Sequence, residues 1–312
     1  MAVTIKNSHW PQLNFSDYGD TLATVQLWTQ IVGKIRLRKS PWLNHSWHVS
    51  LYISARGLTT NSIPYDGGCF DIEFDFVSHL LVVRNSAGQT GTIELRSLSV
   101  AGFYEHLMKL LPEMGIDVEI YAKPNEVDPA IPFAEDETHK TYDGAAMNKL
   151  WQAMVNVNNV FKRFRAGFSG KCSPEHIFWG AFDLAVTRFS GRTAPLHPGG
   201  APNMPVRVMQ EAYSHEVSSC GFWPGSADSP HAIFYSYCYP TLDAFSKQIV
   251  EPSQAGFNAD LGEFVLPYDA IRSAKDPEAV LLRFLQTTYE AAAHTGNWDR
   301  PAMEADLTIY ER

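Results

Sequence analysis

Charged residues are scarce in this sequence, and the basic ones are outnumbered by the acidic ones. Charged residues make up 19% of the 312 residues, below the roughly 25% of a typical soluble domain. Lysine and arginine number 25 against 34 aspartates and glutamates, which gives a net charge of −9. Because binding to a phosphate backbone needs a basic surface, this balance excludes nucleic acid as the main partner.

Long apolar runs and a secretory signal are also missing. No stretch approaches the roughly 18 apolar residues that a membrane helix needs, and the segment MAVTIKNSHW at the start lacks the apolar core of a signal peptide. The cysteines include no C-x-x-C pair, although two disulfides are arithmetically possible. We therefore expect a cytoplasmic protein with reduced thiols and no membrane partner. The cysteines are Cys69, Cys172, Cys220 and Cys238.

None of the common catalytic motifs is present. The sequence has no G-x-x-x-x-G-K-[ST] phosphate loop, no G-x-G-x-x-G turn, no G-x-S-x-G elbow and no H-E-x-x-H zinc motif. The nearest segment, GFSG at Gly167–Gly170, lacks the elbow spacing and is typical of the end of a helix. No reaction is identified by a motif.

Aromatic residues and period-two alternation are abundant. The chain holds 18 Phe, 8 Trp and 13 Tyr, a composition that excludes a disordered chain. In 70–76 apolar residues alternate with Asp71, Glu73 and Asp75, which is typical of a strand with one buried face. The N-terminal part therefore predicts a mainly antiparallel sheet with flanking helices. Its other strands are expected at 47–55, 80–84, 92–95 and 118–121, and its helices at 20–32 and 101–111.

The remainder of the chain predicts a connector and a helix-rich part with a few strands. Residues 1–123 form the sheet part, 124–142 an acidic, proline-containing connector, and 143–312 the helix-rich part, which we expect to pack closely on the first. The fold class is α+β, and the sequence leaves open whether the two parts share one sheet. Helices are expected from Asp143 to Gly167 or Gly170 and over 173–189, 206–217 and 276–294, with strands at 233–239 and 263–266.

Two of these helices predict a metal site. In the helix over 173–189, His176 and Asp183 share one stripe with Thr187, and an acid inside an apolar helix is costly unless it is paired or a ligand. In the helix that follows it, Glu211 and His215 stand four residues apart on one face. If the helices pack side by side, these groups offer two nitrogens and two carboxylates to a divalent metal, namely zinc, iron or manganese.

The same residues also have a structural interpretation, which stays open. Asp183 can pair with Arg188 or Arg192, and His176 can simply decorate the first turn of its helix. A Glu–His pair such as Glu211 and His215 is commonplace on a helix surface.

Two further sets of side chains are candidates for a site. His48 leads a polar strand face, and the acids of 70–76 can share that face, either as a solvated surface or as one wall of a cleft between the two parts. Tyr235, Tyr237 and Tyr239 lie on one face of their strand. Such an aromatic row suits a planar or sugar-like ligand, and equally serves interface packing.

Four phrases of the sequence resemble a known family. They are HSWHVSLYISARGLTT, SPEHIFWGAFDLAVTRFSGR, EAYSHEVSSCGFWPG and GEFVLPYDAIR. Together they resemble a bacterial family of unknown function, domain of unknown function 5996, over nearly the whole chain. The resemblance implies a soluble bacterial protein and assigns no catalytic residue.

The residues favour a cytosolic enzyme that acts on a small molecule in a pocket between the two parts. Hydrolase or lyase chemistry, with or without the metal, fits a set of carboxylates and imidazoles. We expect His48, Asp183 and Tyr237 to take part in catalysis. The alternatives are a non-catalytic protein that binds a small molecule in an aromatic cleft, and a scaffold without a pocket. The sequence determines neither the substrate nor the oligomeric state.

Overall fold

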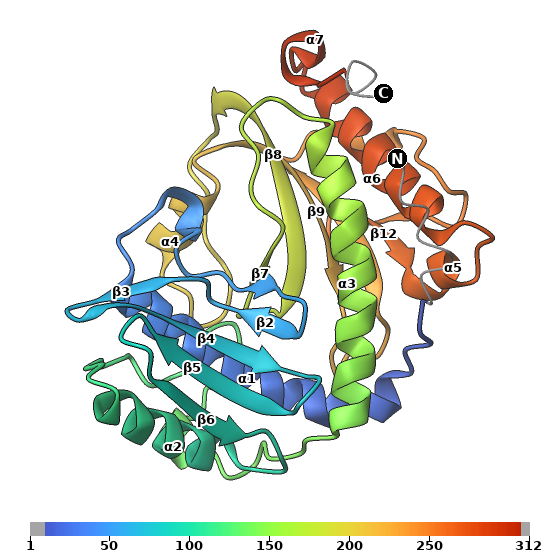
Figure 1. The fold of residues 1–312 in the computed structure, drawn as a ribbon. Coiled ribbons are helices and arrows are strands. Elements are labelled where there is room, and N and C mark those ends of the chain that lie inside the picture. Colours follow the sequence, from blue (N-terminus) through green and yellow to red (C-terminus); the bar gives the residue numbers. More distant parts are fainter. Residues whose placement is uncertain (1–9, 307–312) are drawn as a thin grey trace.

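A computed structural model describes residues 10–306 and confirms the α+β class (Figure 1). Two antiparallel sheets of six strands each form its framework. The first sheet has the strand order β1-β2-β4-β5-β6, and β3 also pairs with β4. Its strands are β1 (Tyr52–Ile53), β2 (Gly57–Thr59), β3 (Ile63–Tyr65), β4 (Gly68–Asp75), β5 (Leu80–Asn85) and β6 (Thr90–Glu94).

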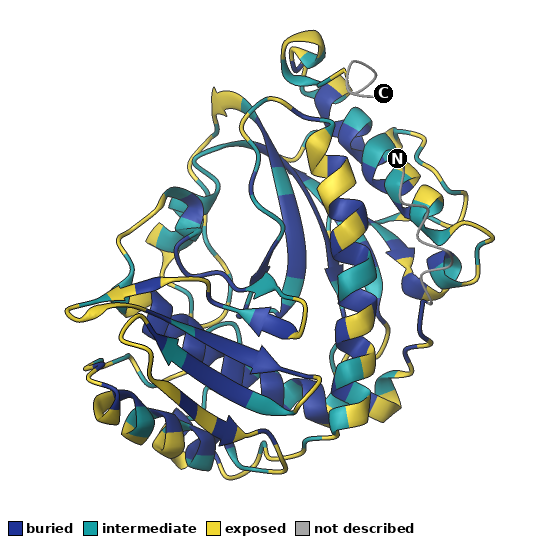
Figure 2. Cartoon of the chain, in the orientation of Figure 1, coloured by how far each residue is buried: buried dark blue, intermediate teal, exposed yellow. Residues whose placement is uncertain are grey.

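Two helices pack with the first sheet. The long helix α1 (Phe15–Lys39) is buried along most of its length, whereas α2 (Val100–Glu113) has an exposed outer side (Figure 2). Trp28 of α1 stacks on Phe103 of α2 with ring centroids 4.8 Å apart, and Phe74 of β4 stacks on Phe103 at 6.1 Å. Because buried aromatic rings contribute much of the apolar area removed from water, this stack fixes both helices against the sheet.

The second sheet has the order β11-β12-β10-β9-β8-β7. The helices α3 and α6 pack on one of its faces, where the strands present Val186, Phe222 and Phe234, all fully buried. The other face is turned away from these helices and lines the candidate site. The strands are β7 (His176–Phe178), β8 (Asp183–Thr193), β9 (His215–Trp223), β10 (Ile233–Tyr239), β11 (Gly256–Asn258) and β12 (Glu263–Pro267), and the helices are α3 (Gly144–Ala166) and α6 (Pro277–Thr295).

The remaining elements are short. They are the helices α4 (Val206–Ala212), α5 (Tyr268–Arg272) and α7 (Arg300–Met303), and the 3-10 turns η1 (Asn44–Ser46), η2 (Phe133–Glu135) and η3 (Phe245–Lys247).

Local signals placed the starts of α3 and α6 correctly, whereas the helix expected over 20–32 covers only the middle of α1. The Asp143 carboxylate accepts a hydrogen bond from the amide of Ala146 at 3.0 Å and caps α3. Asp276 caps α6 in the same way through Ala279, also at 3.0 Å, with proline at the first helical position. These caps satisfy amides that have no partner inside the helix, so the helix starts could be predicted from sequence.

One predicted helix is wrong and another is too long. The segment 173–189 forms β7, a turn and most of β8, and the helix expected over 206–217 ends at Ala212, after which β9 begins at His215. The stretch Leu184, Ala185 and Val186 of β8 is covered on both sides, one by α3 and the other by the walls of a cavity, so it is apolar on both faces and does not alternate. Such a run cannot be distinguished from a buried helix by periodicity.

Two predicted strands also need correction. Residues 118–121 form no strand, and of the strand expected over 47–55 only Tyr52–Ile53 is regular. Instead, residues 44–46 form η1, where His45 and Ser46 each have a φ of 56°. Alternate residues of 47–55, such as Val49 and Leu51, are buried, but most of the segment does not pair with a neighbouring strand.

A backbone bridge between Leu51 and Ile177 joins the two sheets. The Leu51 amide donates to the Ile177 carbonyl at 2.9 Å, and the Ile177 amide donates back at 2.8 Å. Next to it, the indole of Trp179 donates to the carbonyl of Val49 at 2.9 Å. These bonds hold the η1 segment beside β7, where both border the cavity.

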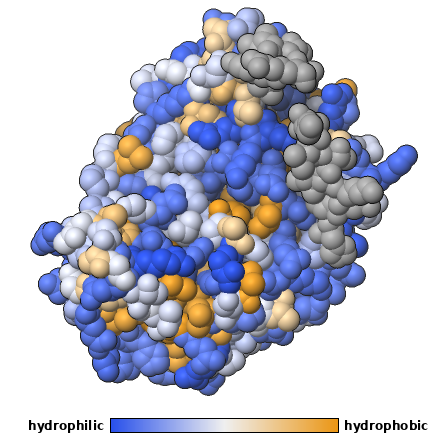
Figure 3. Space-filling model, viewed as in Figure 1, coloured by the Kyte–Doolittle hydropathy of each residue, from blue (hydrophilic) through white to orange (hydrophobic). Residues whose placement is uncertain are grey.

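The face of the molecule shown in Figure 3 is mostly hydrophilic, with small apolar patches. Among residues 10–306, no helix is both long and apolar enough to cross a bilayer.

Candidate functional site

One large cavity, with a volume of about 1670 Å³, lies against the second sheet. Cavities that hold small molecules typically measure about 300–1,000 Å³, so this one can hold a ligand of drug size or larger. Its walls come from the sheet face that α3 and α6 leave uncovered, from η1, from α4 and from the loop that carries Glu126.

The register of the strands decides which side chains face the cavity. Phe178 of β7 pairs with Asp183 of β8, and Thr187 of β8 pairs with Ser219 of β9, which in turn pairs with Tyr237 of β10. Directly paired residues of antiparallel strands point to the same side, and every second residue follows them. The cavity therefore receives His176, Phe178, Asp183, Ala185, Thr187, Phe189, Val217, Ser219, Trp223, Ile233, Tyr235, Tyr237, Glu263, Val265 and Pro267.

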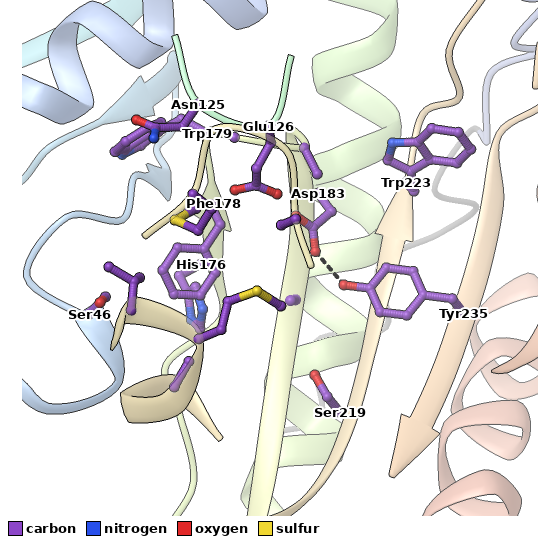
Figure 4. A pocket seen from close by; sticks show the side chains of 18 of the residues that line it. Ser46, Asn125, Glu126, His176, Phe178, Trp179, Asp183, Ser219, Trp223 and Tyr235 are labelled. Atoms are coloured by element: carbon purple, nitrogen blue, oxygen red, sulfur yellow. Dashed lines mark hydrogen bonds between the residues drawn. The ribbon is translucent and has the colours of Figure 1, made fainter. Parts of the chain in front are cut away.

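Asp183 and Tyr235 form the centre of this wall. The hydroxyl of Tyr235 donates a hydrogen bond to Oδ2 of Asp183 (Figure 4). Asp183 lies on β8 and Tyr235 on β10, with β9 between the two strands, and the Tyr235 ring crosses β9 over Gly221. A side chain at Gly221 would overlap this ring, so the glycine provides the space that lets Tyr235 reach Asp183.

Two glutamates, Glu126 and Glu263, also line the cavity. We call Glu126, Asp183 and Glu263 the carboxyl cluster. Burial, and then the charge of Asp183, raise the pKa of Glu126 to about 7 and that of Glu263 to about 7. Burial also raises the pKa of Asp183, and the hydrogen bond from Tyr235 opposes this rise. In Figure 4 the side chains of Glu126 and Asp183 converge on one part of the cavity. Glu126 and Glu263 can therefore exchange protons near neutral pH.

The loop that carries Glu126 is fixed by α1 and by the segment before α4. The side chain of Gln30 donates to the carbonyl of Asn125 at 2.9 Å and accepts from its amide at 2.8 Å. The amide of Glu126 donates to the carbonyl of Pro202 at 2.9 Å, and its carboxylate rests against Gly180, where a side chain would overlap it. Packing thus sets the position of this carboxylate, which forms no ion pair with any residue of 10–306.

Tyrosines extend the wall beyond Asp183. The Tyr213 and Tyr237 hydroxyls are hydrogen-bonded at 2.9 Å, and the rings of Tyr235 and Tyr237 stack with centroids 6.1 Å apart. Burial, more than any neighbour, raises the pKa of Tyr237 well above its usual value, so its hydroxyl stays protonated. These groups can orient a ligand by hydrogen bonding and stacking.

His176 presents a free nitrogen to the same cavity. Its Nδ1 lies 2.6 Å from the carbonyl of Pro174, so Nδ1 carries the proton of the neutral ring and Nε2 holds a lone pair. The side chain is only 1% exposed, and burial lowers its pKa to about 4. No described residue hydrogen-bonds to Nε2. At neutral pH, His176 is an uncharged acceptor that points into the cavity.

Among the described residues, Glu211 binds the backbone of the η1 segment. Its Oε1 accepts from the amide of His45 at 2.6 Å, while the His45 ring contacts the Ala212 carbonyl at 3.0 Å through Nδ1. Nζ of Lys171 donates to the other ring nitrogen at 2.6 Å. His215 lies beside this group, its ring 6.0 Å from that of His45. Glu211 thereby holds η1 in its left-handed backbone conformation.

The four residues predicted as metal ligands do not come together as two facing helices. His176 and Asp183 line the cavity from β7 and β8, whereas Glu211 and His215 belong to the group around His45. Within residues 10–306, no group of three or more His, Cys, Asp or Glu side chains is placed to hold a metal ion. Metal binding stays a prediction, and its premise of two helices is wrong.

The predicted arginine partners of Asp183 are also wrong. Arg192 pairs with Glu216 at 2.6 Å, and Arg188 is buried among aromatic rings, where it donates to the carbonyl of Phe164. Asp183 is bonded by Tyr235 instead.

The acidic face of β4 is a set of ion pairs outside the cavity. Asp71 and Glu73 pair with Arg84 at 3.1 and 2.9 Å, and Asp75 pairs with Arg56 at 2.6 Å. By contrast, His48, Asp183 and Tyr237, the residues predicted to be catalytic, all border the cavity.

Lys34, Glu126 and Glu263 border the cavity although the sequence did not indicate them. Lys34 is 4% exposed, donates to Oδ1 of Asn125, and has its pKa lowered to about 8 by burial. Glu263 could have been found, because it begins a predicted strand two residues before Val265, which pairs with Tyr235. Glu126 lies in a segment whose acidic composition indicates only a solvated connector.

Comparison with known proteins gives a family and no function. The chain belongs to a family of unknown function (DUF5996), whose model matches residues 10–305. Neither the curated proteins nor the solved structures include a significant match.

Proposed function

For this member of a family of unknown function, we propose an enzyme that acts on a small molecule in the cavity, with the carboxyl groups of Glu126 and Asp183 as proton donor and acceptor. The observation that carries the proposal is the position of Glu126: its carboxyl group faces the cavity beside Asp183, with a pKa of about 7. A group whose pKa lies near the working pH transfers protons most effectively.

The two carboxyl groups have different surroundings, which suits different roles. Burial raises the pKa of both carboxyl groups, but Asp183 also accepts a hydrogen bond from Tyr235, which favours its ionised form, whereas the charge of Asp183 further favours the protonated form of Glu126. Pairs of acids with separated roles are typical of enzymes that protonate a leaving group while activating a nucleophile or removing a proton. Hydrolase or lyase chemistry therefore fits best. His48 and Tyr237, on the same cavity, would orient the substrate.

The aromatic walls favour a second candidate, a protein that binds a small molecule without changing it. The rings of Phe178, Trp179, Trp223, Tyr235 and Tyr237 all border the cavity. In that case the carboxyl cluster would bind a polar part of the ligand and would transfer no proton.

Metabolite profiling tests both candidates. The purified protein is incubated with a small-molecule extract of bacterial cells, and mass spectrometry follows which compounds are consumed. We expect consumption of a compound by the wild type and by Glu113→Gln, a variant on the exposed side of α2, and its loss in Glu126→Gln and Asp183→Asn. A compound that is retained unchanged after gel filtration favours the binding protein. Consumption that persists in both cavity variants contradicts the proposed roles.

The predicted divalent metal has a separate test. Elemental analysis of the purified protein, of His176→Ala and of Glu211→Ala would reveal near-stoichiometric zinc, iron or manganese that is lost in both variants if the predicted ligand set holds a metal.

A further inference from the structure

The groups on one side of the cavity indicate the chemical class of its ligand. Glu126, Asp183 and Glu263 come from three separate parts of the chain, the loop before α3, β8 and β12, and each lines the cavity. The side chains of Glu126 and Asp183 converge on one part of the cavity (Figure 4), and the charge of Asp183 also raises the pKa of Glu126 and Glu263. A cation bound beside these carboxyl groups would stabilise them. None of the three carboxyl groups forms an ion pair with a described lysine or arginine, so a bound cation would supply the opposite charge.

The second, independent observation is the unused nitrogen of His176. This side chain is almost fully buried, its Nδ1 is bonded to Pro174, and its Nε2 meets no hydrogen-bond donor among the described residues. His176 pairs with Ala185, so it stands diagonally across from Asp183 on the same face of the sheet. Diagonal neighbours on paired strands are about 7–8 Å apart. A ligand can thus span both groups.

The rings beside the cluster suit a cation as well. Tyr235 bonds to Asp183 and borders the cavity together with Trp223 and Phe178. The faces of Trp and Tyr rings attract ammonium groups, and this attraction is strongest where water is excluded.

We propose that the ligand of this cavity carries an amine, whose ammonium group binds the carboxyl cluster, and a second hydrogen-bond donor that reaches Nε2 of His176. This inference rests on the proposed function, since it takes the same cavity as the substrate site, and it adds the class of substrate. The carboxyl cluster repels anions, and neither the aromatic ring faces nor the uncharged Nε2 of His176 attracts them. This end of the cavity therefore disfavours an anionic ligand.

Three indole compounds that differ in one group test the proposal. They are tryptamine, tryptophol and indole-3-propionic acid, which carry an ammonium, a hydroxyl and a carboxylate, and their binding is measured by isothermal titration calorimetry. The phenyl series of phenethylamine, phenylethanol and phenylpropionic acid repeats the comparison with a smaller ring. We expect each amine to bind about tenfold or more tightly than its alcohol, and each acid to bind most weakly.

Variants locate the effect. Glu126→Gln and Glu263→Gln should each weaken the binding of the amine several-fold and leave that of the alcohol unchanged, with Glu113→Gln as the matched control. His176→Phe should weaken the binding of both tryptamine and tryptophol, because it removes the acceptor of the indole N–H and no charge. Circular dichroism confirms that each variant is folded.

The inference is overturned if the alcohols or acids bind as tightly as the amines, if the amines bind equally well to Glu126→Gln and Glu263→Gln, or if no amine of either series binds. Its failure differs from that of the proposed function. If a non-cationic metabolite is consumed and its consumption depends on Glu126, the proposed enzyme stands and the proposed amine ligand is wrong. If amines bind selectively and no compound is consumed, the amine site stands and the protein is a binding protein.

Discussion

Tyr235 reaches Asp183 across a strand that lies between them, and it does so over Gly221, the residue of that strand with no side chain. The hydrogen bond therefore depends on three strands at once. It fixes one carboxyl group of the cavity wall and holds the Tyr235 side chain on the same wall.

Gly221→Ala should separate this pair. The added methyl group overlaps the Tyr235 ring, so the ring must move away and Asp183 loses its donor. We expect the free energy of unfolding to fall by about 1–3 kcal/mol, the usual cost of leaving a buried polar group without its partner. Urea unfolding measures the change. The matched control is Gly256→Ala in β11, where no atom lies near the added methyl group; an equal effect of the two substitutions would show that Tyr235 has room to move.

Glu126→Gln should change how stability depends on pH. The folded-state pKa of Glu126 is about 7, above the ordinary 4.5, so its contribution to stability is complete below the lower value and is lost as the pH rises through the upper one. The wild type should therefore become less stable relative to the variant, by up to about 3 kcal/mol, between about pH 4.5 and pH 8. Urea unfolding across this range measures the difference. Glu113→Gln should follow the wild type, and parallel curves for wild type and Glu126→Gln would contradict the raised pKa.

Lys34 should react with amine reagents at lower pH than an exposed lysine. Its pKa is lowered to about 8 by burial, and its amine borders the cavity. Half of the Lys34 side chains are then neutral at about pH 8, where a lysine with the ordinary pKa of about 10.4 is almost fully charged. Acetylation by dilute acetic anhydride, followed by peptide mass spectrometry, should give a rate at Lys34 that levels off above about pH 8, unlike that at the exposed Lys109. A rate at Lys34 that still rises tenfold per pH unit beyond that point would refute the shift.

Glu211→Ala should destabilise the η1 segment. The substitution removes the acceptor of the His45 amide in a segment with left-handed backbone, and we expect a loss of about 1–3 kcal/mol in the free energy of unfolding. Glu216→Ala, which breaks an ion pair with Arg192 nearer the surface, should cost only about 0–1 kcal/mol. A chelator added to the wild type separates this structural role from the predicted metal site. If the chelator alone reproduces the loss, Glu211 acts through a metal.

Much of the fold could be predicted where local physics is sufficient. The strand at Ile233–Tyr239 was predicted with its bounds because its side chains alternate between two different environments. The starts of α3 and α6 followed from Asp143 and Asp276, whose carboxylates satisfy free amides within the next turn. The segment 173–189 failed for the opposite reason: both of its sides are covered by other parts of the chain, so its sequence carries no alternation.

The sequence by itself determined the α+β class, the long helices and the family, and it indicated His48, His176, Asp183 and Tyr237, which all border the cavity. Only the tertiary structure decided which groups stand beside Asp183. Tyr235 reaches it across a strand over Gly221, and Glu126 approaches it from a loop fixed by Gln30. Such contacts join residues far apart in the chain, and their pKa values follow from burial, which no local pattern of residues encodes.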